Sequence, residues 1–296
     1  MMKEKVLYVK LPEDAKYRRS VVTEDGMIAI IYSEAKQQVS CKANINVDVV
    51  IPKPKRLIGG TEVYKKDEIP YWYCKIKNGR DEFMYLYMED LTQEDLYYDS
   101  KTGEPRVWIN TPEQENFQNN VLKALANKPK EGYRWIPVFE PSSDENGGLQ
   151  FVKGNKPLVG LNCYEWEKLI ADYSPENESV KSSINTYFLL QLRWLKDGIA
   201  TLEQLIDNST NIGHYRNSKN AQNYFELTGE RKFGGLYGFI GNTCKIVGDS
   251  NSESRFSNVG GNFNCIGNVC PLADVNRIIY PDNEFVDSVG LLELKK

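Results

Sequence analysis

The chain has little of the chemistry that most hydrolytic and metal enzymes use. It contains one histidine, His214, and six cysteines in 296 residues, and no two cysteines form a C-x-x-C pair. A single imidazole argues against a histidine-rich metal site and against Ser-His-Asp or Cys-His nucleophile systems. So few cysteines in this length do not build a disulfide scaffold. We interpret His214, which stands between Gly213 and Tyr215 in a polar stretch, as an ordinary loop residue.

Long apolar runs and an excess of basic charge are also missing. No apolar run approaches the ~18 residues that span a bilayer, and residues 1–9 lack the apolar segment of a signal peptide. The formal charge is -4 with scattered lysines and arginines, which leaves no basic footprint for nucleic acid. We therefore expect cytoplasmic synthesis, no membrane insertion and no nucleic-acid partner.

Hydrophobic content of 41% and charged content of 26% are ordinary for a globular protein. The first part of the chain reads as β-rich, with short apolar runs at residues 5–9, 27–32 and 47–51. The stretch Pro52-Lys53-Pro54-Lys55 is typical of a linker. We predict an N-terminal arm or docking domain over residues 1–56 and a main domain over residues 57–296.

Helix signals in the main domain are few and local. Thr92 with Asp95, Thr111 with Pro112 and Gln114, and Asn162 with Glu165 each have the pattern of a helix N-terminus. A fourth apolar stripe runs from Ile184 to Leu195. Beyond residue 210 we expect loops and short strands, so the fold class is a loop-rich α+β domain.

Three glycine-containing blocks follow one another in the last third of the chain, spanning residues 235–242, 260–270 and 281–291. In this order they resemble the G-L-Y-x-x-x-G-N, G-G-S-x-x-C-x-x-x-x-C and P-D…G-F-R blocks of the family that contains the formylglycine-generating enzyme, or sulfatase-modifying factor. Upstream, residues 156–163 are similar to that family's H-P-V-x-x-V-S-W strand. The resemblance covers residues 57–296 and implies a C-type-lectin-like, sulfatase-modifying-factor-like domain behind the small β-rich N-terminal segment.

The glycines have a physical role independent of the resemblance. We expect Gly241, Gly260 and Gly261 to supply backbone conformations or close approaches that a β-carbon would forbid.

Cys265 and Cys270 keep the spacing at which the enzymes of this family bind Cu(I) as a linear bis-thiolate and oxidise a substrate cysteine. Thiolates are suitable ligands for Cu(I). The neighbours depart from the family pattern, because Asn262 replaces its serine and Val269 replaces a tyrosine. The competing interpretation of the two cysteines is as small apolar side chains. The resemblance therefore implies a retained scaffold without the enzyme, and copper is the alternative cofactor.

Lys245 stands where the resemblance places a carboxylate that helps to hold a structural Ca²⁺. The sequence leaves open whether that site persists or whether the ammonium takes the place of the cation. The arginine of the closing block is also replaced, by Leu292.

Non-catalytic members of this fold bind ligands through the segment before the last strand, which here is residues 263–285. Its candidate binding residues are Phe263, Arg277, Tyr280, Asn283 and Phe285, of types that suit recognition surfaces. The competing interpretation is that half of them pack loops or core.

Three hypotheses follow. The first, which we favour, is a bacteriophage virion protein that docks on other structural proteins through residues 1–56. Its lectin-like body would make assembly contacts or bind a host-surface glycan or protein. The second is a Cu(I)-dependent thiol oxidase. The third is a cytosolic carbohydrate- or protein-binding module outside any particle.

Overall fold

The structure is a computed structural model that describes residues 5–7, 17–22, 28–32, 39–41, 56–58, 61–63, 75–78, 81–100, 102–174, 178–219, 224–249, 252–279 and 281–295. Side chains are described from residue 81 onward, except at residues 249, 252–255 and 276–279. The chain divides into two compact units, Met1–Tyr85 and Leu86–Lys296. Each unit is described by itself.

The first unit is built from antiparallel strand pairs, as its sequence predicts. The pairs are β1 (Lys5–Leu7) with β4 (Val39–Cys41), β2 (Tyr17–Val22) with β3 (Ile28–Tyr32), β5 (Arg56–Ile58) with β6 (Thr61–Val63), and β7 (Lys75–Asn78) with β8 (Asp81–Tyr87). The strands predicted near residues 5–9 and 27–32 are confirmed as β1 and β3. The strand predicted at residues 47–51 and the linker at residues 52–55 lie outside the described residues.

The division between the two compact units falls between Tyr85 and Leu86, and the domain boundary that we predicted after residue 56 stays a prediction. The first compact unit continues past residue 56 because the β5–β6 hairpin begins at Arg56 and its second strand lies against β3 of the same unit. The composition changes at the proline-rich stretch, residues 52–55, but β6, which follows it, still packs on β3 of the first unit.

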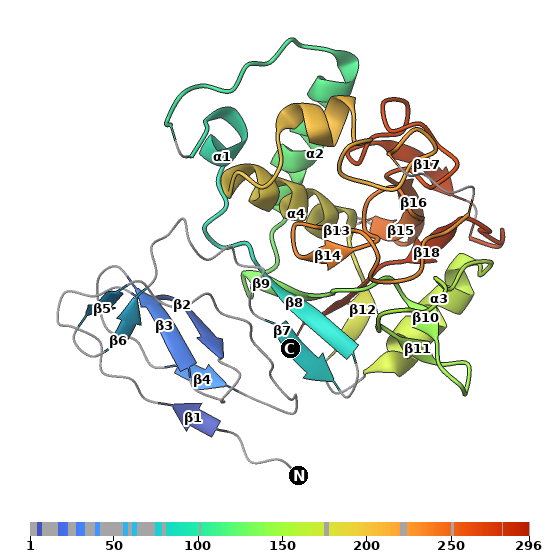
Figure 1. The fold of residues 1–296 in the computed structure, drawn as a ribbon, viewed down its shortest axis with the longest axis horizontal. Helices are drawn as coiled ribbons and strands as arrows, with labels where there is room; N and C mark the ends of the chain where they lie inside the picture. The colour runs from blue at the N-terminus through green and yellow to red at the C-terminus, as the bar shows by residue number, and fades with distance from the viewer. Residues whose placement is uncertain are drawn as a thin grey trace. The chain divides into compact units, whose positions relative to one another are not determined.

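The second unit is a mixed α+β body with two main sheets (Figure 1). One sheet has the order β12 (Ser179–Lys181), β19 (Leu292–Leu294), β9 (Tyr133–Pro137), β8, and the last two residues of β8, Leu86 and Tyr87, fall in this unit. The other has the order β17 (Val275–Ile279), β16 (Ser252–Val259), β15 (Cys244–Asp249), β18 (Ser288–Gly290), in which β15 and β18 are parallel and the other pairs antiparallel. Two short hairpins complete it, β10 (Ser142–Ser143) with β11 (Leu149–Gln150), and β13 (Lys232–Phe233) with β14 (Leu236–Tyr237).

The helices begin close to where their capping residues predict. In α2 (Pro112–Ala126) the Thr111 side chain accepts from the Gln114 amide, and α3 (Cys163–Tyr173) opens with the predicted capping box of Asn162 and Glu165. The predicted cap of α1 (Glu94–Tyr97) is wrong in detail, because the cap residue is Gln93. There the Asp95 carboxylate accepts from the Thr92 amide at 2.7 Å. Of the two contacts in the predicted capping pattern, only the one made by the acidic side chain is therefore present.

Helix α4 (Ile184–Lys196) is the centre of the second unit's core, and its residues 185–195 are all buried. Figure 1 shows α2 beside it, and the Phe117 and Phe188 rings meet edge to face at 6.0 Å. Tyr187 and Trp194 both meet Phe239 in the glycine-rich region, at 5.7 and 5.8 Å between ring centroids. Because α4 is buried on every face, other elements must cover all of it, so the surrounding loops are arranged around this helix.

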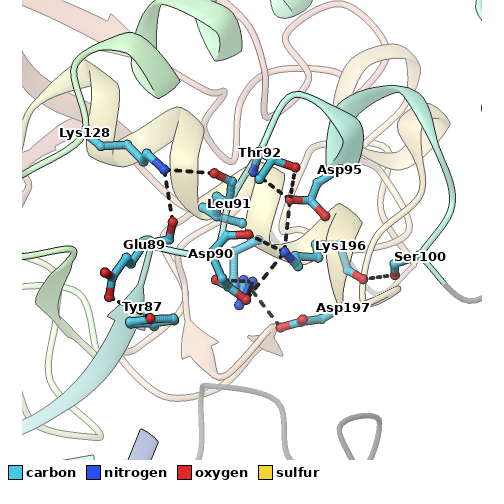
Figure 2. A network of polar contacts seen from close by, with 11 residues as sticks. Tyr87, Glu89, Asp90, Leu91, Thr92, Asp95, Ser100, Lys128, Lys196 and Asp197 are labelled. Carbon is cyan, nitrogen blue, oxygen red and sulfur yellow. Dashed lines mark hydrogen bonds and ion pairs between the residues drawn. The ribbon is translucent and has the colours of Figure 1, made fainter. Parts of the chain in front are cut away.

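The C-terminal end of α4 is pinned by an ion-pair network, shown in Figure 2. Nη2 of Arg193, whose side chain is fully buried, donates to both carboxylate oxygens of Asp90 at 3.0 and 3.2 Å. Nζ of Lys196 lies 3.0 Å from Oδ2 of Asp95, and Nζ of Lys128 donates to the carbonyls of Glu89 and Leu91. A buried charge is tolerated only when it is paired, so these contacts tie α4 to the turn between β8 and α1.

In the part of the chain that the structure describes, no helix is both long and apolar enough to cross a bilayer. Residues 1–4 and 296 lie outside the described ranges.

Candidate functional site

The predicted binding residues have different fates in the structure. Phe263 is half-buried, Asn283 is exposed and Phe285 is half-buried, with its backbone bridged to Leu161. Arg277 lies in β17 opposite Asn258, but its side chain is outside the described residues, as is all of Tyr280. All five thus remain predictions as binding residues, and the backbone of Phe285 takes part in the packing between loops.

Phe263 contacts Phe225, and the two rings lie 4.6 Å apart at a steep angle. We use the name loop surface for this pair together with Tyr224, Leu227 and Val286, which lie beside the contacting segments in the sequence. Tyr224 is 62% exposed and Val286 is 70% exposed. Next to Phe263, Nδ2 of Asn262 donates to Asp287, the residue after Val286. Three separate segments therefore contribute to these two contacts, and only Phe263 was among the residues that the sequence singled out.

Glycines hold the framework beneath the loop surface, as predicted. Gly241 has φ +73°, and a β-carbon there would lie 2.7 Å from the Tyr215 ring and 2.8 Å from the His214 carbonyl. Gly260 has φ +70°. Gly261 has no positive φ, but its β-carbon would lie 2.6 Å from the Cys270 carbonyl. The first two positions need glycine for its conformation, and the third needs it for space.

Cys265 and Cys270 are neighbours in space as well as in sequence. Both are half-buried free thiols, and the amides of Cys265 and Cys270 are held by the carbonyls of Asn262 and Ile266. Burial, followed by the hydrogen bond and then the Coulombic effect of Cys265, raises the pKa of Cys270 to about 12. Burial likewise raises the pKa of nearby Cys244 to about 12. Because the thiolate is the nucleophile and the metal ligand, this environment keeps Cys270 in its unreactive form.

Two adjacent thiols suffice for a two-coordinate soft metal ion such as Cu(I), so the geometry of this pair leaves the copper interpretation open. Within the described ranges, no group of three or more His, Cys, Asp or Glu side chains is arranged to hold a metal ion, which does not bear on a two-coordinate site.

Lys245, in β15, occupies the position that the sequence left open. Its Nζ is buried and surrounded by oxygens: Oε1 of Glu140 at 3.0 Å, the Gly238 carbonyl at 3.3 Å, and the carbonyl and hydroxyl of Thr243 at 2.6 and 2.8 Å. The Phe239 ring centroid lies 5.7 Å away. A carboxylate, two carbonyls and a hydroxyl form an oxygen cage of the kind that hard cations prefer. Here the cage holds an ammonium.

Asn242 connects the oxygen cage to a second, largely buried group, which contains Glu226, Arg231 and His214. Nδ2 of Asn242 donates to Glu140, and its Oδ1 accepts from the Glu226 amide at 2.8 Å. The carboxylate of Glu226 lies 2.9 Å from Arg231 Nη2 and 3.1 Å from Nδ1 of His214. Burial works against the charge of Glu226, but the His214 and Arg231 contacts outweigh it and lower the pKa of this carboxyl to about 2.

His214 is therefore not the ordinary loop residue that the sequence suggested. It does lie in a loop, but it is fully buried against charged and polar partners. Glu140 and Glu226 were not singled out either. Glu140 meets Asn242 across 102 positions of the chain, and no local pattern announces a contact at that separation. In the sequence, only the glycine-containing block around Asn242 pointed to this contact, and it marked Asn242 but not Glu140.

Comparisons with known proteins were made for the whole chain. No protein-family model matches it, and no curated protein matches it. The site is therefore interpreted from its own geometry.

Proposed function

We propose that this chain is a non-catalytic structural and binding protein with a C-type-lectin-like, sulfatase-modifying-factor-like body, and that it belongs to a bacteriophage particle. The loop surface makes the assembly contact or binds the host surface, and the N-terminal segment docks on other structural proteins. The placement in a particle rests on the sequence resemblance. The binding role rests on the loop surface.

One observation carries the binding role. Tyr224 and Val286 are largely exposed. Tyr224 directly precedes Phe225, whose ring packs on Phe263. Val286 directly precedes Asp287, which accepts from Asn262. The Glu226 amide, in the same segment as Tyr224, is held by buried Asn242, which in turn donates to Glu140. Aromatic side chains supply large contact area at low conformational cost and are enriched in recognition surfaces. A rigid base under exposed aromatic side chains also lowers the entropy lost on binding.

One feature supports the absence of catalysis, because the raised pKa of Cys270 disfavours its thiolate. The Lys245 ammonium fills the oxygen cage at the position where the resemblance implies a structural cation, so it bears on the scaffold and not on catalysis.

The test compares two exposed tyrosines. Tyr224→Ala removes a side chain of the loop surface, whereas Tyr98→Ala removes one of similar exposure that directly follows α1, which lies away from β16–β18 in Figure 1. Binding of the full chain to a glycan array is measured together with its mass by light scattering over a range of concentrations. We expect Tyr224→Ala to lose glycan binding or self-association at least tenfold, and Tyr98→Ala to retain it. A chain that stays monomeric and binds no glycan contradicts the proposal, and so does equal loss in both variants.

The alternative of a Cu(I)-dependent thiol oxidase is favoured by a specific observation, the contact of the Cys265 and Cys270 thiols. Titration with Cu(I) tests it. The oxidase requires tight binding that disappears in Cys265→Ala and in Cys270→Ala but survives in Cys163→Ala, a buried free thiol on α3. Failure to bind Cu(I), or binding that the first two variants leave unchanged, removes this alternative.

The third hypothesis, a carbohydrate- or protein-binding module outside a particle, shares the loop surface. It differs in the light-scattering result, because glycan binding by a strict monomer favours it over an assembly protein.

A further inference from the structure

The two ring nitrogens of His214 both face acceptors. Nε2 lies 3.1 Å from the carbonyl oxygen of Tyr224 and Nδ1 lies 3.1 Å from Oε1 of Glu226. The second contact is an ion-pair distance rather than a well-aligned hydrogen bond. The ring is fully buried, and its own amide donates to the Ile240 carbonyl, so His214 is held in place from several sides.

A neutral imidazole has one N–H and one lone pair, so it donates to only one of two acceptors. The other acceptor then faces a nitrogen lone pair inside the protein, which is unfavourable when water is excluded. An imidazolium has two N–H groups and a positive charge, and it serves both the Tyr224 carbonyl and the Glu226 carboxylate. The geometry is therefore complementary to the protonated ring.

The charged and titratable groups around the ring come from each loop packed on it. Glu226 faces it directly, and Arg231 faces the same carboxylate from the other side. Glu140 is connected to the Glu226 backbone through Asn242. The phenol of Tyr215, the next residue, is buried, and burial raises its pKa far above the neutral range. Glu226 and Arg231 form an ion pair beside the ring, so the charges that face His214 are those of this pair.

We propose that His214 is a pH-sensitive latch on the loop surface. As an imidazolium it clamps the Tyr224 carbonyl and the Glu226 carboxylate together, and loss of one proton releases the Tyr224–Phe225 end of the segment. The effect of the latch on ligand binding rests on the proposed function. The latch itself does not.

Hydrogen bonds downstream of Tyr224 and Phe225 confine the proposed release to that end of the segment. Downstream, the Thr228 amide donates to the Asn155 carbonyl at 2.8 Å, and the Glu226 amide is held by Asn242. These bonds do not involve His214. The described contact that fixes the Tyr224 carbonyl is the His214 ring. Phe225 packs on Phe263, so movement of this end changes the loop surface directly.

The chain offers a clean experiment because His214 is its only histidine. In the full chain, ¹⁵N-labelled histidine gives one imidazole whose protonation is followed by NMR over about pH 5 to 8, the range in which histidine changes charge. In parallel, amide exchange is measured for the Tyr224–Phe225 region and for the Thr228 region, with correction for intrinsic rates. A hydrogen bond to a charged group contributes about 1.5–3 kcal/mol, so its loss corresponds to at least about tenfold faster exchange at the high-pH end.

His214→Gln provides the matched variant, because it can donate to one acceptor but does not titrate. We expect its exchange at Tyr224–Phe225 to be independent of pH, while the Thr228 region stays constant in both proteins. Glu226→Gln keeps His214 and removes the carboxylate, so we expect the pH-dependent step to move to lower pH. If His214→Gln does not fold, this second variant decides.

A wild-type chain whose exchange at Tyr224–Phe225 is constant over this range overturns the latch, and so does an unchanged step in either variant. Loss of glycan binding or of self-association in the earlier test does not bear on these measurements. A chain with a pH-dependent step and no ligand keeps the latch and loses the proposed function.

Discussion

The Glu140–Lys245 pair permits a quantitative test of how the second unit is held together. Both side chains are 2% exposed, and the ammonium also holds the Gly238 and Thr243 carbonyls. Lys245→Met keeps most of the side-chain volume but leaves the Glu140 carboxylate without its counter-charge. Breaking a buried pair from one side costs about 3–5 kcal/mol, whereas replacing both charges together is often near neutral.

We therefore expect Lys245→Met and Glu140→Gln each to lower the free energy of unfolding by about 3–5 kcal/mol. That is a large part of the about 5–15 kcal/mol that stabilises a typical domain, and it corresponds to a fall in Tm of about 6–20 °C. The double variant is expected to lose at least about 2 kcal/mol less than the sum of the single losses, because interacting residues are not additive.

The assay is urea unfolding followed by tryptophan fluorescence and by circular dichroism. Four of the five tryptophans lie in the second unit, at positions 108, 135, 166 and 194, so fluorescence reports mainly on the unit that contains the pair. A loss below about 1 kcal/mol for Lys245→Met would refute the reasoning. So would strict additivity in the double variant, because the cage would then not depend on the opposite charges.

We make four further predictions from the contacts and the backbone geometry described above. Lys245→Ala is expected to recover stability when methylammonium is added, as seen in thermal unfolding, whereas Lys245→Met, whose side chain fills the space, is not. The Glu226 carboxyl has a pKa lowered from 4.5 to about 2. Its ionisation therefore contributes up to about 3 kcal/mol to the free energy of unfolding, which is fully present above about pH 4.5 and lost as the pH falls toward 2. In acid unfolding, the stability of Glu226→Gln should lack this part of the pH dependence. Gly241→Ala is expected to cost at least about 2 kcal/mol by chemical denaturation, because strain at φ +73° adds to contacts below 3 Å; Gly147→Ala, with φ +82° and nothing within 4 Å, should cost about 1 kcal/mol. Cys270 should react with iodoacetamide more than tenfold more slowly than a free cysteine at pH 8, as measured by mass spectrometry, since its pKa is about 12; equal rates would contradict that environment.

The local features of the fold were predictable because neighbours in sequence determine them. The capping box of Asn162 and Glu165 and the cap of Thr111 are contacts over three residues, and each formed as predicted. The apolar stripe of α4 was predicted to within one residue. Gly241 and Gly260 were identified because a positive φ is a property that glycine tolerates and other residues do not.

The candidate site was predictable only in part. Phe263 was singled out, but its partner Phe225 lies about forty positions upstream, and no period relates one loop to another. The continuation of the first compact unit beyond residue 56 was not predictable from the sequence for a similar reason. The pairing of β5 with β6 and the packing of β6 on β3 are tertiary choices that a change in composition does not reveal.

The sequence by itself determined the α+β class, the helix starts, the glycine positions and the shortage of histidine that argues against most imidazole chemistry. It also placed Lys245, Cys265 and Cys270 in suggestive positions without deciding what they do. Only the tertiary structure decided that. Folding buries Lys245 in a cage with Glu140 and encloses His214 between Tyr224 and Glu226. The physical reason is that charge and reactivity depend on burial and on the partners within a few ångströms. Glu140 lies 105 positions from Lys245, and even the nearer partners of His214 come from a different part of the loop region, 10 and 12 positions away.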